Sequence, residues 1–229
     1  MFCDNKKKFA VYTSGNCTRI KKAIEIYPEL LCRIKFIITD ECENLVLKQY
    51  FNKLGIQYYN FDVKQIYNKE KRNFLLSNYI EEKLNQNNID YCFTFGKHIL
   101  KGRILEEYKY RLINFHPGII PDVIGLNAID TAIKEKKRYI GNTVHFIDEG
   151  VDSGPIIMQN QILAENFDKY GYDIFLDSMT ELIWKTVRLL ELDRIIIKNN
   201  KVIIKGADYT VSRVFPEFRV AGLINIFQY

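Results

Sequence analysis

The sequence of 229 residues predicts an α/β fold with a Rossmann-like, mostly parallel sheet and a small β-hairpin near its C-terminal end. Short apolar runs alternate with longer amphipathic stretches, which is the pattern of repeated βαβ units. Turn residues such as Gly55 and Gly96 close these runs. The apolar fraction of 47% and the charged fraction of 27% are ordinary for a globular domain, so the chain can bury a substantial core.

Each element follows from a run of residues of one kind. Apolar and β-branched residues predict strands in the first half at 9–13, 34–39, 56–61 and 90–95. The amphipathic segments near them predict helices at 18–31, 44–54 and 69–86. The second half continues with a strand at 112–116, a helix at 127–136, strands at 143–147 and 155–159 and a closing helix at 174–192. Right-handed crossovers then give the Rossmann-like arrangement.

The end of the chain has a different pattern. Residues 195–205 are nearly symmetric about Asn199-Asn200, which predicts a hairpin because asparagine tolerates positive φ. Residues 209–215 have the composition of a third strand. We therefore divide the chain into a main domain, residues 1–192, and a hairpin tail, residues 193–229.

An isolated apolar hairpin is marginally stable, so its side chains should pack on the main domain or across the twofold axis of a homodimer. We expect a homodimer in which the buried residues are Ile195, Ile197, Val202 and Ile204. The alternative is that the tail contacts a base and a phosphate through Tyr209, Arg213, Phe215 and Phe218, although packing of aromatic rings into the body is commoner.

Composition and charge narrow the functional classes. No apolar run is long enough to cross a membrane, and the first residues lack the apolar region of a signal peptide, so we expect a cytoplasmic protein without membrane contact. Five cysteines without a CxxC pair favour free thiols over disulfides or a metal site. The net charge of +5 is scattered, which argues against nucleic acid but suits a phosphorylated or polyanionic small molecule.

The strand at 112–116 carries two polar side chains that could do chemistry. Asn114 and His116 are two positions apart and share one face, while Ile113 and Phe115 point oppositely. A carboxamide and an imidazole at the C-terminal end of a strand suit the polarisation of a carbonyl and the exchange of a proton. The alternative is a turn-forming asparagine beside a histidine with satisfied hydrogen bonds.

A second segment favours the chemical role of Asn114 and His116 over the structural one. The strand at 143–147 leads into a loop with two glycines and three acids, residues 148–155, before the next strand begins. Acids held between two core strands favour a position over a site, and Asp152 is the candidate. We interpret His145, which alternates with apolar neighbours, as structural.

The NFHPGIIP and VHFIDEGVDSGP segments together resemble the folate-dependent formyltransferase family. That family includes phosphoribosylglycinamide, methionyl-tRNA and sugar N-formyltransferases, and the resemblance covers roughly residues 8–190. It implies the formyltransferase fold and N10-formyltetrahydrofolate as co-substrate, without a metal. It also implies that Asn114 and His116 stabilise the formyl oxygen while Asp152 accepts a proton.

The resemblance also implies which residues bind the two substrates. Cofactor contacts, largely through the backbone, fall on Phe95, Gly96, Lys97, His98, Ile99 and Leu100 and on Ile147, Asp148, Glu149, Gly150 and Val151. His98 is unusual at this position of the family, and we take it as a wall of the cofactor pocket or a surface residue rather than a catalyst. Acceptor contacts fall on Ser14, Gly15, Asn16, Pro117 and Gly118.

Two departures from the purine enzyme bear on the acceptor. That enzyme carries SGNGSN where this chain has Ser14-Gly15-Asn16-Cys17, so a glycine that gives a phosphate space is lost. The C-terminal hairpin is similar to those of sugar N-formyltransferases, where it helps to form the dimer. We therefore expect a nucleotide-linked amino sugar as acceptor. The alternatives are phosphoribosylglycinamide formyltransferase of purine biosynthesis and a non-catalytic folate- or nucleotide-binding module.

Overall fold

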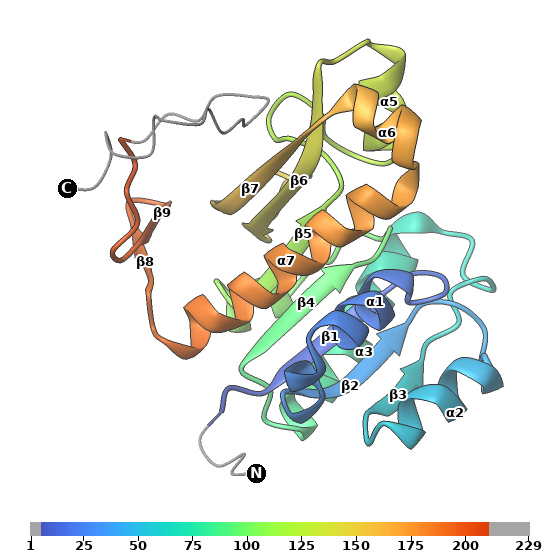
Figure 1. Ribbon diagram of the computed structural model, residues 1–229. Helices are drawn as coiled ribbons and strands as arrows, with labels where there is room; N and C mark the ends of the chain where they lie inside the picture. Colours follow the sequence, from blue (N-terminus) through green and yellow to red (C-terminus); the bar gives the residue numbers. More distant parts are fainter. Residues whose placement is uncertain (1–5, 211–229) are drawn as a thin grey trace, which may run out of the picture.

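The computed structural model describes residues 6–210 and centres on a seven-stranded sheet (Figure 1). The strand order is β3-β2-β1-β4-β5-β6-β7. Five strands pair in parallel: β1 (Phe9–Thr13), β2 (Ile34–Thr39), β3 (Gln57–Asn60), β4 (Tyr91–Phe95) and β5 (Leu112–His116). Two strands then continue the sheet antiparallel, β6 (Tyr139–Phe146) and β7 (Ile156–Leu163). The predicted mostly parallel α/β sheet is confirmed.

Helices cover both faces of this sheet. They are α1 (Thr18–Ile26), α2 (Leu45–Lys53), α3 (Lys69–Gln86), α4 (Ile104–Glu107), α5 (Ala128–Lys134), α6 (Ala164–Tyr170) and α7 (Tyr172–Glu191). Residues of α1 and α7 belong to the larger apolar core on one face, and α3 and α4 contribute to a second core on the other. The central strand β1 is fully buried between them, as a continuous apolar strand predicts.

Several predicted boundaries differ from the observed ones. The first helix ends at Ile26, because Pro28 cannot continue it and instead begins a 3₁₀ helix, Pro28–Cys32. Strands β6 and β7 extend further from their connecting loop than expected. Their added length contains Asn142 and Asn160, which bond to each other, so polar residues concealed the strand pattern. The last long helix begins at Tyr172.

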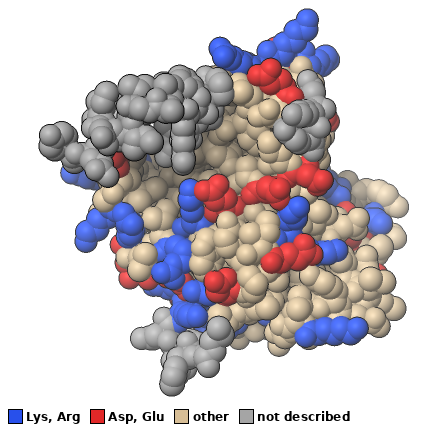
Figure 2. Space-filling view, viewed as in Figure 1, with Lys and Arg blue, Asp and Glu red and all other residues tan. Residues whose placement is uncertain are grey.

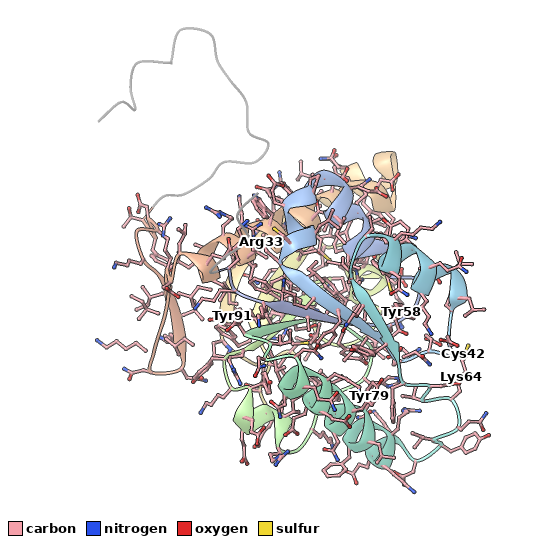
Figure 3. All side chains as sticks on the ribbon, turned by 90° about the horizontal axis from the view of Figure 1, so that it is seen from below. Arg33, Cys42, Tyr58, Lys64, Tyr79 and Tyr91 are labelled. Atoms are coloured by element: carbon pink, nitrogen blue, oxygen red, sulfur yellow. The ribbon has the colours of Figure 1, made fainter. Side chains whose placement is uncertain are left out.

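A buried ion pair attaches α7 to the sheet. Arg33, which precedes β2 (Figure 3), donates through Nε and Nη2 to the two carboxylate oxygens of Glu191 at 2.8 and 3.0 Å. Both side chains are at least nine-tenths buried, and the guanidinium lies over the ring of Trp184. This bidentate geometry fixes the end of the helix against the sheet.

The predicted hairpin is present as β8 (Ile195–Lys198) and β9 (Lys201–Ile204), and Asn199 and Asn200 both have positive φ. Its inner face packs on the main core through Ile195, Ile197 and Val202, three of the residues that the sequence assigned to a partner. The outer cross-strand pair, Ile196 and Ile203, is 45% and 41% exposed. The predicted homodimer would therefore use this outer face.

Tyr209 and Thr210 form a bend, and the rest of the predicted third strand lies outside the described residues, as do Arg213, Phe215 and Phe218. None of the helices in the described part of the chain is long and apolar enough to cross a membrane. Figure 2 shows basic and acidic side chains interspersed on the face viewed there. A continuous basic stripe of the kind that binds nucleic acid is not visible on that face.

Candidate active site

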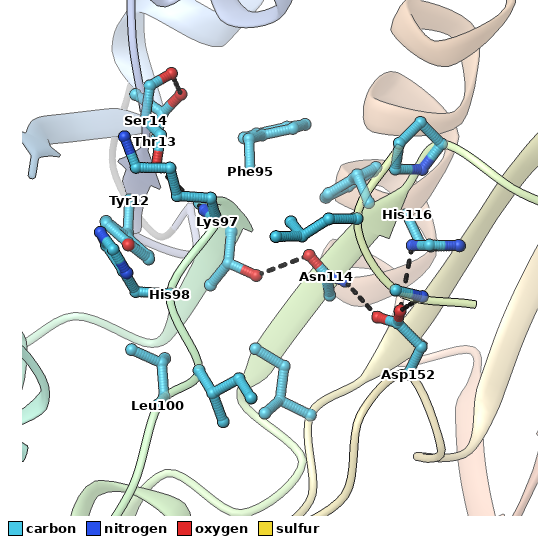
Figure 4. A pocket seen from close by; sticks show the side chains of 18 of the residues that line it. Tyr12, Thr13, Ser14, Phe95, Lys97, His98, Leu100, Asn114, His116 and Asp152 are labelled. Atoms are coloured by element: carbon cyan, nitrogen blue, oxygen red, sulfur yellow. Dashed lines mark hydrogen bonds and ion pairs between the residues drawn. The ribbon is translucent and has the colours of Figure 1, made fainter. Parts of the chain in front are cut away.

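The main pocket lies at the C-terminal ends of β1, β4 and β5 and has a volume of about 920 Å³ (Figure 4). This edge is where parallel α/β sheets place ligands. Register explains the convergence, since Thr13 pairs with Phe95 and Thr94 pairs with Asn114 at the strand ends. The walls are formed mainly by residues within 12–19, 94–100, 114–117, 125–127 and 145–152.

Asn114, His116 and Asp152 meet in this pocket. Asn114 Nδ2 donates to Asp152 Oδ1 at 3.2 Å, and its Oδ1 accepts from Thr94 Oγ1 at 3.0 Å. His116 Nδ1 lies 3.3 Å from Asp152 Oδ2. As the strand pattern predicts, Ile113 and Phe115 point the other way, into the core. The structure thus brings together the three residues that the sequence singled out.

The ring of His116 is held at both nitrogens. Its Nε2 is 2.9 Å from the carbonyl oxygen of Val123, which makes Nε2 the protonated nitrogen. Burial lowers the pKa of His116, and the nearby Asp152 carboxylate opposes that shift only in part. The imidazole is therefore neutral near pH 7, with its unprotonated Nδ1 directed at Asp152.

Asp152 occupies a strained position between several donors. Its backbone has φ of 50°, a left-handed conformation that is uncommon for residues other than glycine. The Gly125 N–H donates to its Oδ2 at 2.7 Å. Burial alone would raise the pKa of Asp152, but His145, His116 and the Gly125 N–H outweigh it and lower that pKa. The carboxylate is consequently ionised and aimed into the pocket.

Sequence reasoning missed the fourth member of the cluster, His145. Its Nδ1 is 2.8 Å from the Phe146 carbonyl oxygen, and its Nε2 lies 3.1 Å from Asn114 Nδ2 and 3.5 Å from Asp152 Oδ1. The antiparallel register places His145 directly opposite Asn114. Pairing the strands at 112–116 and 143–147 by their polar positions would have found it.

Most predicted cofactor residues line the pocket. All six residues from Phe95 to Leu100 do so, as do Ile147, Asp148, Gly150 and Val151. His98 lines the wall, as expected, with its side chain 10% exposed. Glu149 departs from the prediction because its side chain is exposed and outside the lining. The acidic loop turns there, since Asp148 Oδ1 accepts from the Gly150 N–H and from Ser153 Oγ.

Three of the five predicted acceptor residues line the main pocket, and two glycines do not. Ser14, Asn16 and Pro117 line the main pocket. Gly15 lines a neighbouring cavity of about 500 Å³ instead. Gly118 lies behind the triad, where a Cβ would meet His116 Nε2 at 2.6 Å, so it is required for packing rather than for ligand contact.

Cys17 stands where the purine enzyme has a glycine, and it keeps a backbone conformation that glycine favours. It keeps a left-handed backbone with φ of 58°, and its side chain is 2% exposed in the core. The side chain of Cys17 packs in the core, and the residue also forms part of the pocket lining. Burial raises the pKa of the thiol to about 12, so it is not a nucleophile at neutral pH.

Four further pocket residues carry no signal in the sequence. Arg19, in the first turn of α1, donates to Tyr172 Oη at 3.2 Å, and both residues line the pocket. Lys69 and Arg72 of α3 line it as well. Lone basic residues at helix ends resemble solvated surface residues, so only the fold reveals that they line the pocket. Within residues 6–210 no His, Cys, Asp or Glu side chains group in threes to hold a metal ion.

A family model described as formyl transferase matches residues 7–171, well over half of the chain. The chain belongs to the formyl transferase family. It is 28% identical over 165 residues to phosphoribosylglycinamide formyltransferase of Bacillus subtilis, covering 71% of this chain and 82% of the relative. It is 33% identical over 132 residues to formyltetrahydrofolate deformylase of Haemophilus influenzae, covering 55% of this chain and 46% of the relative.

Similarity extends to longer proteins and to solved structures. This chain is 26% identical over 168 residues to the trifunctional purine biosynthetic protein adenosine-3 of Drosophila melanogaster. The match covers 69% of this chain but only 12% of that longer protein. The formyl transferase superposes on glycinamide ribonucleotide transformylase 1 of Symbiobacterium toebii with a TM-score of 0.75 and 22% identity, covering 88% of this chain and 95% of that one. This likeness confirms the predicted formyltransferase fold.

Proposed function

We propose that this formyl transferase moves the formyl group of N10-formyltetrahydrofolate to the amine of a nucleotide-linked amino sugar. One observation carries the reaction: Asn114 and His116 each lie within 3.3 Å of Asp152 inside a single large pocket. A carboxamide donor, an imidazole and an ionised carboxylate are the groups that acyl transfer to an amine needs. The volume of about 920 Å³ is at the upper end for small-molecule sites, which suits two substrates.

The proposed reaction has one attack and one departure. The amine nitrogen attacks the formyl carbon, and the electron pair of the carbonyl moves to the formyl oxygen. Asn114 Nδ2 is positioned to donate to that oxygen in place of one of its present partners. The attacking nitrogen gives a proton to Asp152, directly or through water. Asp152 returns that proton to N10 as the carbonyl re-forms and the bond between N10 and the formyl carbon breaks. The products are the N-formylated amine and tetrahydrofolate.

The bond from His116 Nε2 to the Val123 carbonyl refines the role of this histidine. With that nitrogen engaged, the other one faces Asp152, so His116 chiefly receives and returns the proton that Asp152 handles. Asn114 is then the main donor to the oxygen. Removing such a donor typically costs about 10²–10³ in rate.

The acceptor half of the pocket supports a nucleotide. Arg19 presents a guanidinium beside the loop at Ser14 to Asn16, and guanidinium groups match phosphate oxygens well. Tyr172 is 41% exposed, stacks on Phe175 and receives a hydrogen bond from Arg19. An aromatic ring next to a guanidinium suits a base and its phosphates.

Phosphoribosylglycinamide formyltransferase is the second candidate, favoured by the Bacillus subtilis relative and by the glycine-like backbone of Cys17. The deformylase relative raises a related possibility, in which water replaces the amine. The test incubates the protein and N10-formyltetrahydrofolate with glycinamide ribonucleotide, with several nucleotide-linked amino sugars, or with no acceptor. Tetrahydrofolate release that requires an amino sugar supports the proposal. The proposal is rejected if tetrahydrofolate is released only when glycinamide ribonucleotide is the acceptor. It is also rejected if tetrahydrofolate and formate are released when no acceptor is added.

A further inference from the structure

A buried carboxylate outside the triad connects the two halves of the pocket. Asp40 follows β2, and its side chain is fully buried. Its Oδ2 accepts hydrogen bonds from Tyr12 Oη at 2.9 Å and from Ser14 Oγ at 2.5 Å. Ser14 Oγ in turn accepts from the backbone N–H of Lys97 at 2.9 Å. One carboxylate oxygen therefore joins the loops that follow β1, β2 and β4.

The cofactor loop also rests on the ring that Asp40 holds. A Cβ on Gly96 would meet three atoms of the Tyr12 side chain at 2.1 to 2.5 Å, so the backbone of this loop lies directly against the ring. Burial, with the charge of Asp40, raises the pKa of Tyr12 well above its ordinary value. The hydroxyl therefore remains a donor to Asp40 at neutral pH, and the position of Tyr12 sets that of Gly96.

The charge of Asp40 needs an explanation beyond packing. Its Oδ1 has no hydrogen-bond partner, and neither has His98 Nε2, which lies 3.6 Å from Oδ2. The ammonium group of Lys97, on the adjoining loop, bonds to Glu41 instead. A buried carboxylate with an unpaired oxygen is costly, and a neutral side chain could join the same loops. A charged acceptor holds its donors more tightly and more precisely placed than a neutral one.

We propose that Asp40 is a positioning residue for formyl transfer, which fixes the acceptor loop at Ser14 to Asn16 against the cofactor loop at Gly96 to His98. The proposal rests on the assignment of these loops under Proposed function. Asp40 itself stays behind the wall, since Tyr12, Ser14 and His98 line the pocket and Asp40 does not. On this proposal both substrates bind to one shared frame.

Asp40→Asn tests this because it keeps the shape and removes the charge. We expect the KM values of both substrates to rise about tenfold, the factor by which a neutral acceptor weakens a charged hydrogen bond. The kcat should fall by less than either KM rises, since the triad is untouched. A purely structural role would lower the fraction of active protein, and hence kcat, and leave both KM values unchanged. That result, or a rise in only one KM, overturns the proposal.

Asp90→Asn is the matched control. Asp90 Oδ2 accepts from the Lys8 backbone N–H at 2.7 Å, a similar connection at the opposite ends of β1 and β4. Its KM values should equal those of the parent protein. Ser14→Ala and the double variant Asp40→Asn/Ser14→Ala guard against a folding defect in the single variant. The two changes should be non-additive, because they break one chain of hydrogen bonds, and fully multiplied effects would contradict the proposal.

Binding of tetrahydrofolate by calorimetry keeps this test separate from the choice of acceptor. Weaker binding in Asp40→Asn, with Asp90→Asn unchanged, supports the role of Asp40 at the cofactor loop even if no amino sugar is turned over. Equal dissociation constants for tetrahydrofolate in the parent protein, Asp40→Asn and Asp90→Asn refute that role. The acceptor arm then uses whichever amine the screen identifies.

Discussion

Asp152→Asn removes the negative charge at the centre of the triad while keeping the shape of the side chain. The carboxylate receives hydrogen bonds from the Gly125 N–H and from Asn114 Nδ2 and faces two imidazoles. A carboxamide still accepts one of these bonds but cannot take a proton from the attacking amine. Loss of a positioned proton acceptor costs about 10²–10⁴ in rate. We expect kcat to fall by that factor.

The fold should survive this change. Asparagine adopts the left-handed backbone at least as readily as aspartate, so the φ of 50° adds no strain in the variant. The side chain is about 12% exposed and lies in a loop, away from the apolar core. The thermal midpoint should therefore remain close to that of the parent protein, which separates a catalytic effect from unfolding.

The pH dependence has a definite sign. Burial lowers the pKa of His116, and the Asp152 carboxylate opposes that shift. An acid limb due to His116 should lie below pH about 6.5 in the parent and at still lower pH in Asp152→Asn. The free energy of unfolding should also decrease on the acid side. Unfolded His116 binds its proton more readily than the folded residue, so the free energy of unfolding should decrease as the pH falls below about 6.5.

The assay is release of tetrahydrofolate from about pH 4 to pH 8, which covers the ordinary histidine pKa of about 6.5 and the lower values expected for His116. Thermal unfolding is measured in the same buffers. Asp90→Asn, at the opposite ends of β1 and β4 from the pocket, is the matched control and should keep the parent rate. A folded Asp152→Asn variant with near-parental kcat would refute the role of Asp152. An acid limb that moves to higher pH in this variant would refute the coupling to His116.

The remaining predictions concern single features. Asn114→Ala and His116→Ala should each lower kcat by about 10²–10³ without additive effect in the double variant. Gly150→Ala places a Cβ 2.0 Å from a neighbouring side chain, so the KM for the folate should rise while kcat changes less. Glu191→Ala leaves a buried guanidinium unpaired and should cost about 3–5 kcal/mol in unfolding experiments. Truncation at residue 193 should abolish the homodimer and expose the core residues that the hairpin covers. Sedimentation should then show monomer or aggregated protein.

Each of these has an outcome that contradicts it. A fully active alanine variant at Asn114 or His116 removes that residue from the mechanism. An unchanged folate KM in Gly150→Ala means that the acidic loop does not contact the cofactor. Full-length protein that sediments as a monomer at micromolar concentration refutes the homodimer. Ile203→Lys, which changes only the exposed outer face, should give a monomer with its fold intact.

The sequence predicted the parts of the fold in which local pattern and tertiary position agree. Strand β5 is an example, because its alternation separates Asn114 and His116 from the core residues between them. The pattern failed where a polar residue is buried by tertiary hydrogen bonds. Asn142 is 1% exposed and bonds to Asn160 and Ser178, two distant segments that no local rule connects.

The site was predictable as residue types but not as contacts. The strand and loop patterns indicated Asn114, His116 and Asp152, and the resemblance gave their expected roles. His145 was missed because alternation alone assigns it to a core face. Its role depends on which strand lies opposite, and that is decided by the fold. Arg19 and Tyr172 are 153 positions apart, so their hydrogen bond leaves no trace in either segment.

The loop between β6 and β7 shows why its motif combines two glycines with an aspartate. A Cβ on Gly154 would meet the backbone carbonyl oxygen of Phe146 at 1.9 Å, so this position must lack a side chain. A Cβ on Gly150 would meet Ser153 Oγ at 2.0 Å, so a side chain there would displace the Ser153 hydroxyl from Asp148. These close approaches fold the loop back on the end of β6. Asp152 then takes its left-handed conformation, at a cost of about 1–2 kcal/mol. That cost is offset by its bonds to Gly125 and Asn114, which form only in the folded protein. The glycines therefore act on the site indirectly, because they allow the close loop in which the Asp152 carboxylate reaches both Asn114 and His116.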